Sequence, residues 1–147
     1  DENRASRIAE ARESFDATLQ KILRENQVTA GDQLILVGFS QGSIMSLDAL
    51  VRNALPLAGV VAFSGRLASP EPFHPAAGVA ALLIHGQSDP VIPWTESQHA
   101  QQVLEGLGVE VTAVFEPGVP HTISAEGVTL AADFIQQRFS LSSGCLS

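Results

Sequence analysis

Four segments of the chain carry apolar residues at every third or fourth position, a spacing that predicts helices with one apolar face. Residues 29–32 (TAGD), Pro56, and Gly106 with Gly108 are the predicted ends of the first three helices. The apolar positions are, segment by segment, Ile8, Ala11, Phe15, Leu19 and Ile22; Ile44, Leu47 and Val51; Ala100, Val103, Leu104 and Leu107; and Val128, Ala131, Ala132, Ile135 and Phe139.

Four other segments, residues 33–39, 57–63, 79–85 and 109–116, are rich in aliphatic residues and bounded by Gly or Pro, which predicts strands. The first three are apolar along their whole length, so we expect burial on both faces, as in a parallel sheet covered by helices. The proline-rich residues 64–78 read as a surface loop that could border a site. The pattern predicts an α/β fold with a mostly parallel sheet of about four strands and helices on both faces.

Composition fits a single domain spanning residues 1–147, because the chain has 147 residues, 45% of them hydrophobic and 16% charged. A net charge of −8, with no cluster of Lys or Arg, argues against nucleic-acid binding. No apolar run is long enough to cross a bilayer, and the first residues lack the features of a signal peptide. Cys145 is the only cysteine, so no internal disulfide can form. We therefore expect a soluble, cytoplasmic protein without stable membrane insertion.

A Gly-x-Ser-x-Gly pattern follows the strand at 33–39, with Ser40 between Gly38 and Gly42. In a nucleophile elbow the serine occupies a sharp strand-to-helix turn, and we expect a side chain at either glycine to collide with the neighbouring helix or strand. The alternative is a serine in an ordinary turn. The strand before the pattern and the helical spacing after it favour the elbow.

A serine nucleophile needs a base and an acid, which in this type of fold follow it in the order acid, then His, in loops after later strands. Asp89 follows the third strand and is the best acid, although a turn-former before Pro90 is the alternative reading. His121 follows the fourth strand and is the best base. Glu116 is the only credible rival acid.

The remaining ionisable residues are weaker candidates for catalysis. His85 is expected to pack and to hold the Asp89 loop by hydrogen bonding. His74 lies in the proline-rich loop, and His99 lies on a helix, as do Asp48 and Asp133. No cluster has the spacing of zinc ligands and no phosphate-binding loop is present, so we expect neither metal nor cofactor.

Together, the stretches "GFSQGS", "AFSG", "HGQSDPVIP" and "PHTIS" resemble the phospholipase/carboxylesterase group of α/β hydrolases, which includes acyl-protein thioesterases. The resemblance implies a triad of Ser40, Asp89 and His121, an oxyanion donor in the Gln41 backbone N–H, and hydrolysis of acyl esters or thioesters without a cofactor. Ser43 stands where the family usually has Gly or Ala. Neighbouring residues that could line an acyl pocket are Ser64, Leu67, Val91 and Trp94.

The chain departs from this family at its front, where members carry several further strands and a His-Gly loop that supplies a second oxyanion donor. The resemblance therefore implies a truncated α/β-hydrolase fold with an open apolar edge at 33–39. We expect a homodimer, or a further N-terminal segment, to cover that edge. Alternative functions are a catalytically weak or silent remnant acting as a binding module and, less favoured, a serine peptidase.

Overall fold

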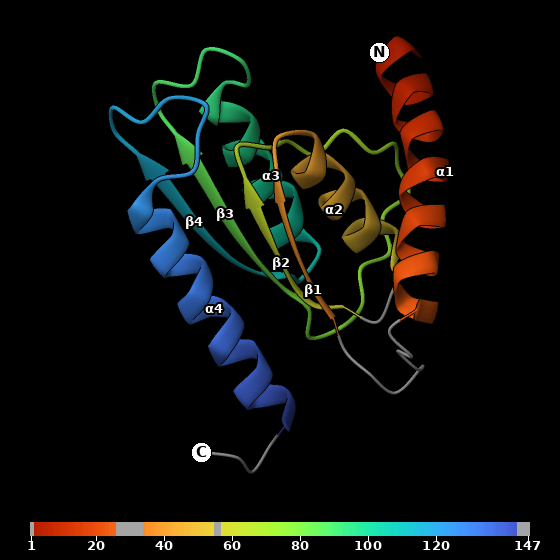
Figure 1. Cartoon of the computed structure of the whole chain (residues 1–147). Helices are drawn as coiled ribbons and strands as arrows, with labels where there is room; N and C mark the ends of the chain where they lie inside the picture. The colour runs from red at the N-terminus through yellow and green to blue at the C-terminus, as the bar shows by residue number, and fades with distance from the viewer. Residues whose placement is uncertain (1, 26–33, 55–56, 144–147) are drawn as a thin grey trace.

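Strands and helices alternate along the chain (Figure 1). The computed structural model describes residues 2–25, 34–54 and 57–143. Each predicted strand is confirmed within one residue at either end, whereas residues 29–32, Pro56 and Cys145 lie outside the described residues. The elements are α1 (Glu2–Glu25), β1 (Leu34–Phe39), α2 (Gln41–Arg52), β2 (Leu57–Phe63), β3 (Ala80–Gly86), α3 (Trp94–Gly106), β4 (Glu110–Glu116) and α4 (Ala125–Ser143).

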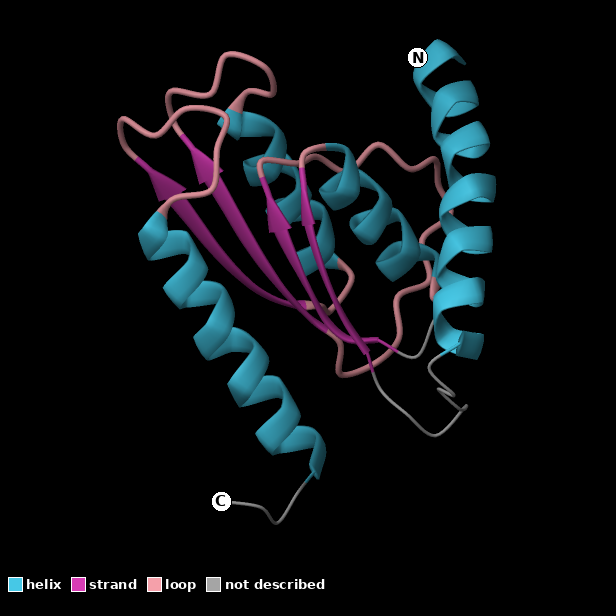
Figure 2. Cartoon of the chain, viewed as in Figure 1, coloured by secondary structure: helices cyan, strands magenta, loops and turns pink. Residues whose placement is uncertain are grey.

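The four strands form one parallel sheet in the order β1-β2-β3-β4, which confirms the predicted α/β fold. Because the strands are parallel, their carboxyl ends meet at one edge of the sheet, and the loops that follow them gather there (Figure 2). Strands that follow one another along the chain are also adjacent in the sheet.

Helices cover the two faces of the sheet unequally. On one face, α2 and α3 enclose a core that includes Leu47, Leu50, Leu83 and Leu104, and α1 packs outside α2. On the other face α4 is the only helix among the described elements, with Ala131 packed on side chains of β2 and β3 (Figure 1). No helix in the described ranges is long and apolar enough to cross a membrane.

Strand β1 is less buried than the sequence predicts. Every residue of β2 and β3 is buried, as expected, but Val37 is 52% and Phe39 37% exposed. Leu34 and Leu36 pack on the core beneath α2, whereas α4 contacts β2 and β3. The prediction that this strand is buried on both faces is therefore wrong for the described chain, because α4 does not extend over it.

A buried carboxylate joins α1 to the rest of the fold. Asp48 of α2 accepts hydrogen bonds from Arg12 of α1, Arg52 and Ser69, at 2.6 to 2.9 Å. Burial would raise the pKa of Asp48, but the hydrogen bonds from Arg12, Ser69 and Arg52 outweigh it and hold the pKa below its usual value. The partnership also raises the pKa of Arg12. Asp48 therefore acts as an ionised structural anchor.

Candidate active site

Ser40 lies at the apex of a sharp turn between β1 and α2. Its backbone has φ 54° and ψ −114°, a conformation that non-glycine residues seldom adopt. Its N–H donates to the carbonyl oxygen of Phe63 on β2 at 2.9 Å. A Cβ at Gly38 would lie 2.5 Å from the carbonyl carbon of Gly42, so the turn requires glycine at position 38. This geometry is that of a nucleophile elbow.

Gly42 does not have the steric role that the sequence predicts. A Cβ at this position would meet no atom of the described structure within 4 Å. In the turn, the backbone of Gly42 lies where a Cβ of residue 38 would be. The predicted collision is therefore confirmed for Gly38 and wrong for Gly42.

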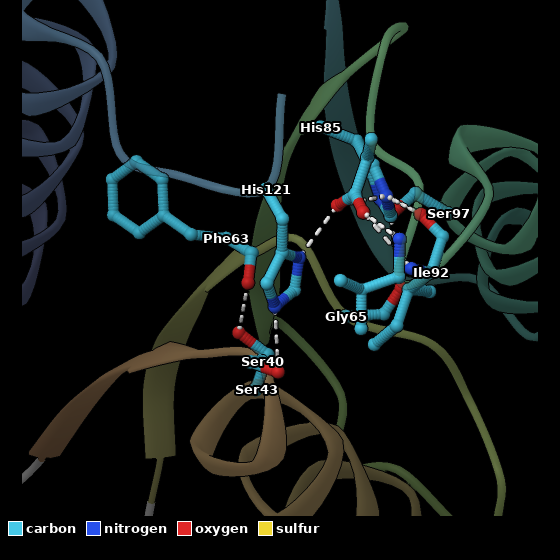
Figure 3. A network of polar contacts seen from close by, with 10 residues as sticks. Ser40, Ser43, Phe63, Gly65, His85, Ile92, Ser97 and His121 are labelled. Carbon is cyan, nitrogen blue, oxygen red and sulfur yellow. Dashed lines mark hydrogen bonds and ion pairs between the residues drawn. The ribbon is translucent and has the colours of Figure 1, made fainter. Parts of the chain in front are cut away.

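The side chains of His121 and Asp89, from two later loops, meet Ser40 at the carboxyl edge of the sheet. His121 Nε2 lies 3.0 Å from Ser40 Oγ, and His121 Nδ1 lies 2.7 Å from Asp89 Oδ2. Figure 3 shows the His121 imidazole with dashed contacts at both ring nitrogens, one of them to Ser40. A carboxylate can only accept, so Nδ1 carries the proton and Nε2 is free to accept one from Ser40. The three residues are thus placed for serine-based nucleophilic catalysis.

The Asp89 carboxylate is held in one orientation by its own loop. Its Oδ1 accepts the backbone N–H groups of Val91 at 2.8 Å and Ile92 at 2.9 Å, which leaves Oδ2 for His121. Burial would raise the pKa of Asp89, but the hydrogen bonds from His121, Ile92 and Val91 outweigh it and lower the pKa below its usual value. The side chain stays ionised at neutral pH and can stabilise a protonated imidazole.

The loop that carries His121 rests directly on the end of β3. The Val119 carbonyl accepts the Ser88 N–H at 3.0 Å, and it lies so close to Gly86 that a Cβ there would overlap it. The ring of Phe39 lies 4.8 Å from that of His121, with an interplanar angle of 43°. Phe39 was not among the residues predicted from the sequence, although its position directly before Ser40 is a usable signal.

His85 braces the acid loop, as the sequence predicts. It is fully buried, with Nε2 at 2.7 Å from the Ile92 carbonyl oxygen and Nδ1 at 2.6 Å from Ser97 Oγ (Figure 3). Because a carbonyl can only accept, Nε2 carries the proton and Nδ1 accepts from Ser97. Ser97 was not predicted to take part, and nothing in the sequence marks it, because the contact depends on where α3 begins.

The other acid and histidines that the sequence offered as catalytic candidates make contacts elsewhere in the fold. The carboxylate of Glu116 accepts the Ser124 hydroxyl at 2.8 Å, at the start of α4. The backbone N–H of His74 donates to the Val51 carbonyl oxygen, and His99 lines a cavity between α3 and the 64–78 loop. Within the described ranges, no group of three or more His, Cys, Asp or Glu side chains is placed to hold a metal ion.

The four residues predicted to line an acyl pocket lie in different surroundings. Ser64 is buried at the end of β2, Val91 is 64% exposed beside Asp89, and Trp94 packs on Phe115 with ring centroids 5.1 Å apart. Leu67 packs against the core and is the only one of the four that lines a cavity of about 540 Å³ between the 64–78 loop and α3. The acyl-pocket assignment stays a prediction.

Known proteins similar to this chain are esterases and thioesterases. The phospholipase/carboxylesterase family model matches residues 1–139. Esterase YpfH of Escherichia coli (strain K12) is 32% identical over 137 residues, which cover 92% of this chain and 58% of that protein. Acyl-protein thioesterase 1 of Gibberella zeae is 26% identical over 73% of this chain and 48% of that protein. The crystal structure of esterase PE8 superposes with a TM-score of 0.76 at 32% identity, covering 91% of this chain and 63% of that one. The chain spans about half the length of the curated relatives it matches.

Proposed function

We propose that this chain, which belongs to the phospholipase/carboxylesterase family of α/β hydrolases, is a serine carboxylesterase that cleaves short- to medium-chain acyl esters or thioesters. The observation that carries the proposal is the continuous hydrogen-bonded path from Ser40 through His121 to Asp89, at 3.0 and 2.7 Å. The nucleophile, base and acid are all side chains of this chain, so the reaction needs no cofactor.

The proposed reaction begins with attack by Ser40 Oγ on the acyl carbonyl carbon. His121 Nε2 accepts the serine proton as the bond forms, and Asp89 stabilises the resulting imidazolium through its hydrogen bond to Nδ1. His121 then returns the proton to the leaving alcohol or thiol. Water, activated by the same histidine, releases the acid from the acyl-serine and restores Ser40.

The oxyanion formed during this attack requires donors near Ser40. The N–H of Gln41 belongs to the first turn of α2, where backbone N–H groups have no acceptor within the helix. The helix dipole also favours a negative charge at this end. We assign Gln41 N–H as one oxyanion donor, as the family resemblance implies.

A second candidate function is a catalytically weak or silent chain that acts as a binding module. What favours it is that the Gln41 N–H is the one oxyanion donor assigned within the described residues, whereas the family resemblance implies a second donor from a His-Gly loop. Loss of one oxyanion donor typically lowers kcat by about 10²- to 10³-fold.

Hydrolysis of p-nitrophenyl acetate and butyrate by the wild-type chain and by Ser40→Ala tests the proposal. We expect hydrolysis by the wild type and only background rates for the variant. Equal rates in the two proteins would refute the esterase function. Labelling by a fluorophosphonate adds a second measurement: labelling of wild type but not of Ser40→Ala, without turnover, would favour the silent binding module.

A further inference from the structure

Ser43, in the first turn of α2, takes no part in the proton transfer path but touches the turn that holds the nucleophile. Its side chain is completely buried. Its Oγ lies 2.6 Å from the carbonyl oxygen of Gly38 and 2.7 Å from that of Phe63, so one hydroxyl proton serves two acceptors. Figure 3 shows the contact with Phe63. The hydroxyl therefore joins the carboxyl ends of β1 and β2.

Both carbonyl groups belong to the support of Ser40. The Phe63 carbonyl oxygen also accepts the N–H of Ser40 itself, at 2.9 Å. The Gly38 carbonyl lies two residues before the nucleophile, where the backbone leaves β1 and enters its unusual conformation. The Ser43 hydroxyl thus contacts the peptide group before the turn and the acceptor that holds its apex.

The space around Ser43 limits which residue can make these contacts. A Cβ at Gly65 would lie 2.5 Å from Ser43 Cβ, so glycine at position 65 makes room for the serine. Alanine in place of Ser43 would occupy almost the same volume but would leave both carbonyls without this donor. Each carbonyl would have one buried donor fewer, although the Phe63 carbonyl would keep the Ser40 N–H, so the turn is expected to relax.

We propose that Ser43 is a positioning residue for the nucleophile, and that its hydroxyl holds Ser40 Oγ within hydrogen-bonding distance of His121 by fixing the two carbonyls beneath the turn. The inference rests on the proposed function, because it assigns Ser43 a role in placing the attacking oxygen. A small displacement of a reacting group can cost much rate, so a side chain that never touches substrate can still control kcat.

The test compares Ser43→Ala with a matched control, Ser46→Ala. Ser46 is also a buried serine of α2, but its hydroxyl donates to the Gly42 carbonyl oxygen within the same helix, at 2.8 Å. Both variants lose one buried oxygen atom from one helix. We expect Ser43→Ala to lower kcat by about 10-fold with KM nearly unchanged, and Ser46→Ala to leave kcat within about twofold of the wild type.

Hydrogen exchange gives a readout that does not depend on turnover. The Ser40 N–H, bonded to Phe63, should exchange faster in Ser43→Ala than in Ser46→Ala, at matched loss of thermal stability. Unchanged kcat and unchanged Ser40 exchange in Ser43→Ala would overturn the inference while leaving the esterase function intact. Equal wild-type and Ser40→Ala rates would instead refute the function, and exchange would still decide whether Ser43 fixes the turn.

Discussion

The two flanks of the site differ in how completely the chain encloses them. On the flank formed by β3 and β4, Asp89 and His85 have fully buried side chains, and the His121 loop rests on Gly86. On the flank formed by β1, Val37 is 52% exposed and Gly42 faces open space. The nucleophile therefore stands between a braced flank and an open one.

This difference separates two requirements of ester hydrolysis. In the proposed mechanism, proton transfer depends on Ser40, His121 and Asp89, whose contacts lie within the described chain. In the same proposal, the oxyanion is stabilised by the Gln41 N–H, on the open flank. Changes on the braced flank should therefore alter proton transfer most, and changes at the exposed side chains of the open flank should be tolerated.

The largest effect is expected for Asp89→Asn, on the braced flank. The amide can still accept from Val91 and Ile92, but its NH₂ group would face Nδ1 of His121 and favour the tautomer that cannot accept the serine proton. We expect kcat to fall by up to about 10⁴-fold, as for the same exchange in serine proteases. Steady-state kinetics measures the effect, and a wild-type rate in a folded variant would remove Asp89 from the mechanism.

The two glycines of the nucleophile turn should respond in opposite directions to alanine. Gly38→Ala places a methyl group 2.5 Å from the Gly42 backbone and should cost about 3 kcal/mol of stability, with loss of activity. Gly42→Ala meets open space within α2 and should stabilise by about 0.5–1 kcal/mol through helix propensity. Denaturant unfolding measures both; destabilisation by Gly42→Ala would mean that the space beside Gly42 is filled.

Acid should weaken the anchor that holds α1. Because the folded-state pKa of Asp48 lies below the usual 3.8, its stabilisation is complete above that value and is lost as pH falls through the folded pKa. We expect Asp48→Asn to cost about 2 kcal/mol at neutral pH and to flatten the dependence of unfolding free energy on pH below about 4.

Asp16→Asn is the matched control for this prediction. Asp16 pairs with Arg52 of the same cluster at 3.1 Å, but its side chain is 43% exposed. Its loss should change stability by less than about 0.5 kcal/mol. Circular dichroism measures the free energy of unfolding of Asp48→Asn and of the wild type over about three pH units, from pH 2 to 5. The same pH dependence in both proteins would contradict the role of Asp48.

The smallest effect on monomer stability is expected for Val37→Lys on the open flank. Since Val37 is already half exposed, the free energy of unfolding should change by less than about 0.5 kcal/mol.

We further propose that a second copy of the chain, or another segment, covers this edge in solution. Light scattering after size exclusion should then show a larger species that Val37→Lys weakens, and a clean wild-type monomer would refute pairing between copies.

The sequence predicted the braced flank better than the open one. Strand limits were predictable because apolar runs end at Gly or Pro, and the order of Ser40, Asp89 and His121 followed from loops after parallel strands. The resemblance implied an open edge at 33–39, but the exposure of the Val37 side chain on the sheet face was not predictable, because it depends on how far α4 reaches across the sheet. The link between His85 and Ser97 was missed for a similar reason, since it depends on α3 beginning at Trp94.

The sheet order β1-β2-β3-β4 also bears on how the molecule forms. Each new strand pairs with the strand made just before it, so no strand must insert between two others. Each parallel pairing spans a helical connection and forms slowly, but this order lets the sheet grow strand by strand while the chain is being synthesised. His121 follows the last strand, so we expect the catalytic arrangement to close only when the final β-α unit docks.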